Sequence, residues 1–496
     1  MPNALCAKRY SLLPMSYHLR AISYFFSVCY ALCVFLRNFA LCTLHFAFFI
    51  FIILCGFFSI AHADVGDILT KFHPYIGVQE DYSSNINLTP TNPKEDFITT
   101  IAPGLRFSTA PITYSLIPGQ FQAAPMGPGM VITPGQFPQP APAPDAWGVD
   151  LNYLLGLVSY AKNSQYNFVS HAGTLNAWYS SDPRFSLRLR DYFIRSENPR
   201  EQEYAAGAPR DQFIPAIQRN RAVYSRNVLE PTMEYQFGKE DRILLYYRNN
   251  IYQTENPSAE NSQENFINPR LNYWFDIRNG ISLEYGLTLG DFQSSPDLVG
   301  HMARARYIYR FDPHTSIFGE DIFMRRDFAP PGIDYDVHNP SIGIEHAFSP
   351  TLTARLQAGY YLQIPERGST NNGITYDLGL TQIIEKTTLA LSFQGGYTEV
   401  FFGSQNLGLI PYYRSIARIS HWFTERTNSA LSGSYEIIEY SSGQKDDIWR
   451  VSGNASYLAL KWLALSVTIS YLEDNSNVGN GGYRESRAIL WAVVNP

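Results

Sequence analysis

The sequence predicts an all-β protein, a transmembrane antiparallel β-barrel of about twenty strands, and three observations support this. Charged residues make up only 17% of the chain, while strand and turn formers are abundant, with 34 Tyr, 32 Phe, 34 Gly and 31 Pro. Apolar and polar residues alternate with a period of two in many short segments. Tight turns and longer polar loops follow one another at nearly regular spacing along the second half of the chain.

Residues 1–63 are expected to be a signal or targeting segment, which leaves the barrel domain at 64–496. The segment has four basic residues and no acidic residue before Asp64, and its apolar run 41–60 precedes the small-x-small sequence Ala61-His62-Ala63. An uncleaved membrane anchor is the alternative, because about 20 apolar residues span a bilayer.

Charge and cysteine usage exclude several classes of protein. All five cysteines lie within the first 55 residues, so the expected barrel has no disulfide or thiolate chemistry. Without residues 1–63 the chain keeps 38 − 4 = 34 basic and 44 acidic residues, a net charge of −10. Nucleic acid is therefore not an expected partner.

Alternation predicts strands that each have one apolar and one polar face. It is clear at 242–251, 389–398 and 413–423. In the second of these segments the two faces are Leu389, Leu391, Phe393 and Tyr397 against Ser392, Gln394 and Thr398.

The turns indicate how these strands are joined. Markers of the tight turns are separated by 40, 34, 37, 36, 39 and 36 residues, at Lys239, Asn279, Pro313, Pro350, Lys386, Glu425 and Lys461. Longer polar loops lie midway between them, at 254–263, 293–299, 329–334, 365–373, 441–447 and 475–482. Short turns at one end and long loops at the other are typical of outer-membrane barrels. We count strands near 71–82 and 97–109 and eighteen more between 147 and 493, and we place the total between 18 and 22.

Physical chemistry requires such a sheet to close. Lipid cannot satisfy the backbone N–H and C=O groups of an open edge, so the first strand must pair with the last, with the apolar face outward. The alternative is a secreted soluble β-sandwich or solenoid that buries this face in a core.

The first hairpin resembles a known family. Its segments Tyr75-Ile-Gly-Val-Gln-Glu-Asp-Tyr82, Asn85-Ile-Asn-Leu-Thr-Pro90 and Asp96-Phe-Ile-Thr-Thr-Ile-Ala-Pro-Gly-Leu105 are similar to the outer-membrane β-barrel porins found with PEP-CTERM/exosortase and exopolysaccharide systems. The match covers about thirty residues. It implies an outer-membrane barrel of a Gram-negative bacterium serving polysaccharide export or surface assembly, and it implies no site residues.

An insertion and the end of the chain, Trp491-Ala-Val-Val-Asn-Pro496, depart from that resemblance. Residues 110–146 contain nine prolines and no charge before Asp145, and they repeat Pro-Gly-Gln-Phe. They predict a spacer on the periplasmic side or a tether for a periplasmic partner. The loop 196–221 predicts either a surface loop or an inward constriction.

Basic residues at alternating positions point toward the lumen, because their neighbours on the other face are apolar. They could favour anionic solutes or acidic polysaccharide, or they could pair with lumen acids such as Glu284 and Asp321 and stiffen the wall. The candidates are Arg188, Arg190, Arg248, Arg304, Arg306, Arg310, Arg414 and Arg418.

No catalytic, metal or cofactor motif is apparent. The ten histidines include no His-x-x-x-His pair, and no Gly-x-Ser-x-Gly elbow or phosphate loop occurs. A hydrolase site assembled across neighbouring strands is an open alternative.

These observations predict a pore or export conduit, with exopolysaccharide-related cargo by resemblance. A structural or adhesion barrel that works through its external loops is the second reading. Outer-membrane lipids and the barrel assembly machinery are the expected partners, and Trp491 could serve as the C-terminal aromatic residue that this machinery recognises.

Overall fold

The computed structural model describes residues 70–109, 147–200, 221–479 and 481–495. From Lys71 onward the chain forms one compact unit. The targeting segment 1–63 and the proline-rich segment 110–146 lie outside the described residues, as do 201–220 of the loop after Ser196.

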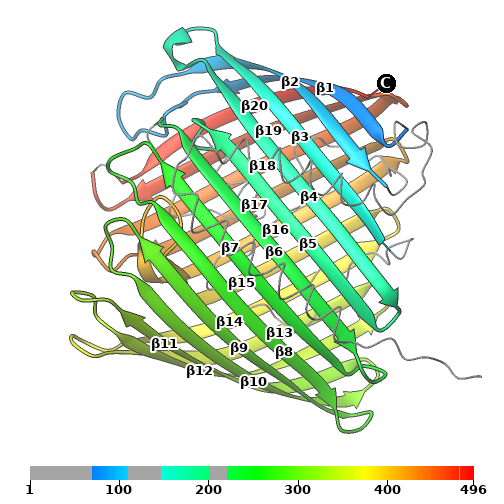
Figure 1. The fold of residues 1–496 in the computed structure, drawn as a ribbon, viewed down its shortest axis with the longest axis vertical. Helices are drawn as coiled ribbons and strands as arrows, with labels where there is room; N and C mark the ends of the chain where they lie inside the picture. Colours follow the sequence, from blue (N-terminus) through cyan, green and yellow to red (C-terminus); the bar gives the residue numbers. More distant parts are fainter. Residues whose placement is uncertain (1–69, 110–146, 201–220, 480, 496) are drawn as a thin grey trace, which may run out of the picture. The chain divides into compact units, whose positions relative to one another are not determined.

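The compact unit is a closed antiparallel β-barrel of 20 strands, which confirms the predicted fold (Figure 1). Each strand pairs with the next along the chain, and β1 pairs with β20 to close the sheet. The strands are β1 Phe72–Ser83, β2 Asp96–Ser108, β3 Trp147–Tyr160, β4 Phe168–Asp182, β5 Phe185–Ser196, β6 Tyr224–Gln236, β7 Arg242–Thr254, β8 Ser262–Trp274, β9 Asn279–Phe292, β10 Leu298–Asp312, β11 Thr315–Phe328, β12 Tyr335–Ser349, β13 Leu352–Pro365, β14 Asn371–Ile384, β15 Thr387–Val400, β16 Gly408–Thr424, β17 Thr427–Glu439, β18 Lys445–Leu460, β19 Leu463–Ser476 and β20 Tyr483–Val494, with a 3-10 turn at Ser164–Tyr166.

The seam between β1 and β20 joins the two ends of the barrel. In Figure 1 the blue β1 lies close to the red β20. Inside the seam, Arg487 donates to both oxygens of Asp81, with nitrogen–oxygen distances of 2.5 to 3.0 Å. Trp491 packs over Gly77, where a Cβ atom would lie 2.7 Å from the indole ring. A larger residue at position 77 would therefore displace this tryptophan.

Alternation gives the barrel its two faces. On β10, Val299 and Tyr307 are exposed on the outside, whereas Arg304 and Arg306 are buried on the inside. Bulky apolar side chains cover the outer face, as at Ile342, which is 64% exposed. Exposed aromatic residues ring the end that carries the tight turns, which is typical of a membrane interface; examples are Trp147, Phe275, Phe311, Phe348, Phe423 and Trp462.

The two ends of the barrel differ as the sequence predicts, and we call them the turn side and the loop side. Aspartates close several tight turns because a carboxylate can accept hydrogen bonds from the following backbone N–H groups. Asp276 accepts from Arg278 and Asn279, and Asp312 accepts from His314 and Thr315.

The hairpin of β15 and β16 departs from the wall. Pairing of β14 with β15 stops at Tyr376 opposite Gly395, although β14 itself continues to Asn371. Pairing of β16 with β17 starts only at Tyr412. Residues 396–411, which we call the inner hairpin, therefore have no wall neighbour on either side and enter the lumen.

Glycines mark the point of departure. A Cβ atom on Gly395 would lie 2.4 Å from the ring of Tyr376, and Gly396 has φ of +149°, a conformation that favours glycine.

Within the described residues, no helix is long and apolar enough to cross a bilayer.

Candidate functional site: the barrel lumen

The inner face of β5–β11 carries a chain of buried ion pairs, which we call the arginine wall. Each pair joins an arginine to a carboxylate on the adjacent strand. The pairs, with their nitrogen–oxygen distances, are Arg190 with Glu230 (3.0 Å), Arg248 with Glu264 (2.6 Å), Arg270 with Glu284 (2.9 Å), Arg304 with Glu284 (3.4 Å) and Arg306 with Glu320 (2.6 Å).

Glu320 is the most heavily used carboxylate of this wall. One of its oxygens accepts from Nε of Arg304 at 2.7 Å and from Nε of Arg306 at 2.6 Å, and the other accepts from Gln357 at 3.3 Å. Its side chain is fully buried. Removing one partner of such a buried pair leaves an uncompensated charge, so Glu320 is required for the stability of β10 and β11.

All eight arginines singled out in the sequence lie on the inner face, but their surroundings differ. Arg310 lies at the turn side, 3.5 Å from the Trp274 ring centroid and hydrogen-bonded to Glu240. Arg414 donates to Glu436 at 2.8 Å. Arg188 is half-buried and Arg418 is exposed to the lumen, whereas Arg190, Arg248, Arg304 and Arg306 belong to the arginine wall.

Of the two acids expected to pair with these arginines, one is in the lumen and the other is not. Glu284 binds Arg270 and Arg304. Asp321 lies on the exposed outer face of β11, because Glu320 takes the inward position and neighbouring residues must alternate. The expectation for Asp321 was wrong.

The inner hairpin is held against β11–β13 by a buried ion pair. Arg326 of β11 donates to Glu399 with a shortest distance of 2.6 Å, and the hydroxyl of Tyr335 donates to the same carboxylate at 2.8 Å. Beside them, the rings of Tyr397 and Tyr361 are 4.8 Å apart. Odd-numbered residues of β15 face outward near the turn side. In the inner hairpin, the odd-numbered residues Tyr397 and Glu399 instead contact the inner surface of β11–β13.

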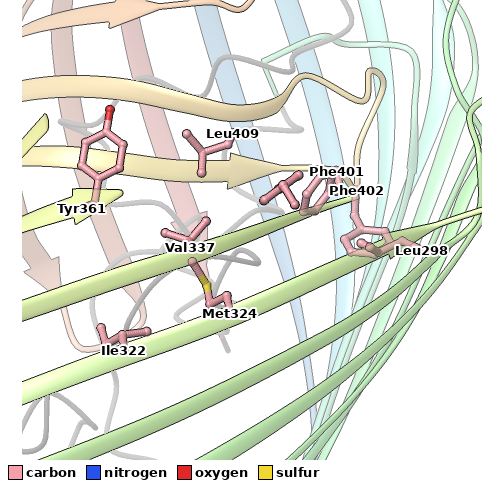
Figure 2. Close-up of a cluster of buried hydrophobic side chains, with 9 residues drawn as sticks. Leu298, Ile322, Met324, Val337, Tyr361, Phe401, Phe402 and Leu409 are labelled. Atoms are coloured by element: carbon pink, nitrogen blue, oxygen red, sulfur yellow. The ribbon is translucent and has the colours of Figure 1, made fainter. Parts of the chain in front are cut away.

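The tip of the inner hairpin reaches the far side of the lumen. Phe402 stacks on Phe292 at the end of β9, with ring centroids 5.3 Å apart, and the carbonyl of Ser404 accepts from the backbone N–H of Glu260 at 2.9 Å. Figure 2 shows Phe401 and Phe402 beside Leu298, within a cluster that also includes Met324. The inner hairpin therefore crosses the barrel from β14–β17 to β7–β9.

The second face of the inner hairpin is buried as well. Ile410 packs with Ile438, Ile448 and Leu472 of the β17–β19 wall and with Leu88 of the β1–β2 loop. Because apolar contacts cover both faces, the hairpin is held inside the lumen at the loop side.

A third segment closes over the same mouth. Arg200, which follows β5, is buried and forms an ion pair with Glu485 of β20, and it donates to the carbonyl of Ile86 at 3.3 Å. Residues 201–220, the larger part of the loop expected as a surface loop or constriction, lie outside the described residues.

The turn side of the lumen is more open. Arg355 and Asp377 retain 16% and 24% exposure of their side chains, and Thr381 and Arg418 are exposed on the inner face. Small polar residues line much of this region, including Ser432 and Ser452, whose hydroxyl oxygens are 2.8 Å apart.

Sequence reasoning missed the inner hairpin. No polar loop was expected between the turns at Lys386 and Glu425, because the connecting residues 401–407 begin with Phe401 and Phe402. The available signal was a connection that begins with two phenylalanines, whereas the other long connections of the second half contain none, together with Gly395-Gly396.

The described histidines offer no catalytic constellation. His301 and His171 bond to tyrosine hydroxyls, and His346 and His421 to threonine hydroxyls, all on the outer face. Among the described residues no group of His, Cys, Asp or Glu could hold a metal ion.

Comparison with known proteins finds similarity in architecture only. No family model and no curated protein matches the sequence. The structure is similar to the siderophore receptor PirA from Pseudomonas aeruginosa (9% identity, 86% of this chain and 80% of that chain, TM-score 0.46) and to the ferric citrate transporter FecA (11%, 86% and 79%, 0.45). It is also similar to OccK3 from Pseudomonas aeruginosa (10%, 87% and 98%, 0.38). No residue role is transferred at these identities.

Proposed function

We propose that the chain is a pore in the outer membrane of a Gram-negative bacterium and that the inner hairpin closes it at the loop side. One observation carries the proposal: a polar lumen, open toward the turns, is crossed at its other end by a hairpin that belongs to the barrel but leaves its wall. A barrel of purely structural use would not require a water-facing lumen on one side of such a closure.

Planar-bilayer recording of the mature protein tests this proposal. We expect low conductance from the unmodified barrel and a clear increase when residues 400–407 are replaced by a two-residue turn, since the apolar tip would no longer reach β9. A matched control replaces the loop 477–482 by the same two-residue turn. Absence of conductance in all three proteins would contradict a pore.

The solute class is a finer proposal. Arginines predominate on the β5–β11 wall, but four carboxylates neutralise much of their charge, so we expect anion preference to depend more on Arg418, whose side chain is exposed on the inner face, than on the buried Arg304 or Arg306. Neutral Arg418→Gln should lower the anion-to-cation permeability ratio, whereas an unchanged ratio would remove anions from the proposal.

Exopolysaccharide-related cargo rests on the resemblance of the first hairpin. Deleting the gene should abolish surface polysaccharide while leaving its synthesis intact in cell extracts. Normal surface polysaccharide in the deletion strain would leave a diffusion pore as the function, or an adhesion role in the external loops if conductance is also absent.

A further inference from the structure

Beside the inner hairpin, the barrel wall contains a strand edge that is not paired with β15. On the loop side of Tyr376, residues 371–375 of β14 do not pair with β15. The other edge of β14 pairs with β13 as far as Asn371. Ile374, on the outer face of this edge, is 63% exposed. An exposed strand edge is a template for pairing with another strand.

The register already present lower in the barrel defines which residues would meet there. Tyr376 lies opposite Gly395, and the ladder continues downward to Ile384 opposite Thr387. Extending the same ladder upward by two residues places Ile374 opposite Tyr397, and by four residues Asn372 opposite Glu399. No shift of register is needed.

The sequence pattern of β15 fits this second position as far as Tyr397, and beyond it Glu399 would lie on the outer face at the loop end of the strand. Leu389, Leu391, Phe393 and Tyr397 alternate with polar residues as one lipid-facing row. In the observed position Tyr397 has turned inward to stack on Tyr361. Zipped onto β14, Tyr397 would return to the outer face beside Ile374, and Thr398 would face the lumen.

From this geometry we infer that the barrel is a two-state switch, in which residues 396–411 either lie across the lumen or zip onto the edge of β14 and open it. This deepens the proposed pore by naming how it opens. Gly396, at φ of +149°, is the hinge, and the Arg326–Glu399 ion pair with the Phe402–Phe292 contact is the latch of the closed state. Opening exchanges these contacts for backbone pairing with β14.

Cysteine crosslinking distinguishes the two states, because no cysteine occurs after residue 55. The open-state pair is Ile374→Cys with Tyr397→Cys, whose positions now lie on opposite sides of the wall. The control pair is Leu378→Cys with Phe393→Cys, which are register partners in the intact part of the same ladder. The closed-state pair is Ser404→Cys with Glu260→Cys, joined by a backbone hydrogen bond.

Each pair is oxidised in outer-membrane vesicles and quantified by mass spectrometry of the linked peptides. We expect all three pairs to link, and oxidation of the open-state pair should raise the time that the channel spends conducting by about tenfold over its reduced form, since the return step is blocked. Oxidation of the closed-state pair should abolish conductance, and reduction should restore it.

The proposal is overturned if the open-state pair stays reduced under conditions that fully link the control pair. It is also overturned if the closed-state pair links completely without changing a measurable conductance. Crosslinking of the open-state pair without any conductance would support the switch while contradicting the pore, so failure of one does not mimic failure of the other.

Discussion

The two walls of the lumen are built on different principles. On β5–β11, buried arginines and glutamates interlock from strand to strand, whereas the inner face of β13–β18 carries many Ser, Thr and Gly residues, and an ion pair there joins Arg414 to Glu436 at 2.8 Å. Buried pairs of this kind tie neighbouring strands together, and small hydroxyl side chains do not. The wall that the tip of the inner hairpin contacts is therefore the more rigid one, and the hairpin itself belongs to the less constrained wall.

The largest effect should come from breaking the fixed wall. Glu320→Gln leaves Arg304 and Arg306 without their shared carboxylate, so we expect the free energy of unfolding to fall by about 3–5 kcal/mol. Urea unfolding in lipid vesicles measures this change. Glu345→Gln is the control, because that carboxylate is 43% exposed and 3.9 Å from Arg355, and its effect should stay within about 0.5 kcal/mol. Equal effects would mean that burial of the Glu320 ion pairs does not set their contribution to stability.

A smaller effect should separate the inner hairpin from the wall. Phe402→Ala removes the contact with Phe292, and burial of one such ring is worth about 2 kcal/mol, so amides of 396–411 should exchange with deuterium roughly thirtyfold faster. Phe393→Ala on β15, the strand that leads into the hairpin, is the matched control, since that ring is 41% exposed on the outer face. Unchanged exchange in the hairpin would show that its tip is not what holds it.

Selectivity offers a third contrast between the walls. Arg418→Gln removes a charge from an exposed, inward-facing side chain, so we expect a roughly twofold fall in the anion-to-cation permeability ratio, limited by salt screening, with a smaller loss of stability than at a buried arginine. Arg304→Gln should show the opposite behaviour, with a large loss of stability and little change in selectivity. Reversal-potential measurements under a salt gradient check both variants.

The smallest effect concerns the turn side. The guanidinium of Arg310 holds the pKa of Glu240, in the turn before β7, below its usual value. Stabilisation by this pair is therefore complete above the unfolded pKa, about 4.3, and is lost as the pH falls through the lower folded value. Both side chains are about one-third exposed or more, so Arg310→Gln should cost only about 0.5–1 kcal/mol at pH 7. Its unfolding curve should approach that of the unmodified protein at pH 3, and a constant difference would argue against the pair.

Sequence patterns predicted the barrel because most outward side chains of its strands are apolar, although Asp321 is an exception. The turn at Asp312, the alternation around Arg304 and the strand number all follow from that regularity. The lumen obeys no single rule. Ile322, Met324 and Val337 face inward and are apolar because they contact the inner hairpin. Both faces of β11 and β12 therefore carry apolar residues, and their alternation does not show which face points into the lumen. Asp321 was misplaced for this reason, and the hairpin that explains the pattern connects residues too distant in sequence for a local rule.

The seam has a consequence for how the molecule is made. Asp81 and Arg487 are separated by 406 positions, so the bidentate bond that fixes the register of β1 against β20 forms only after translation has passed the final strand. Until then the strands can form only an open sheet, which has one apolar face and two unpaired edges. Closure of the barrel must therefore follow synthesis of the whole sheet, and the apolar face and the edges must be protected until then. A chain cut before β20 would lack the strand that pairs with β1.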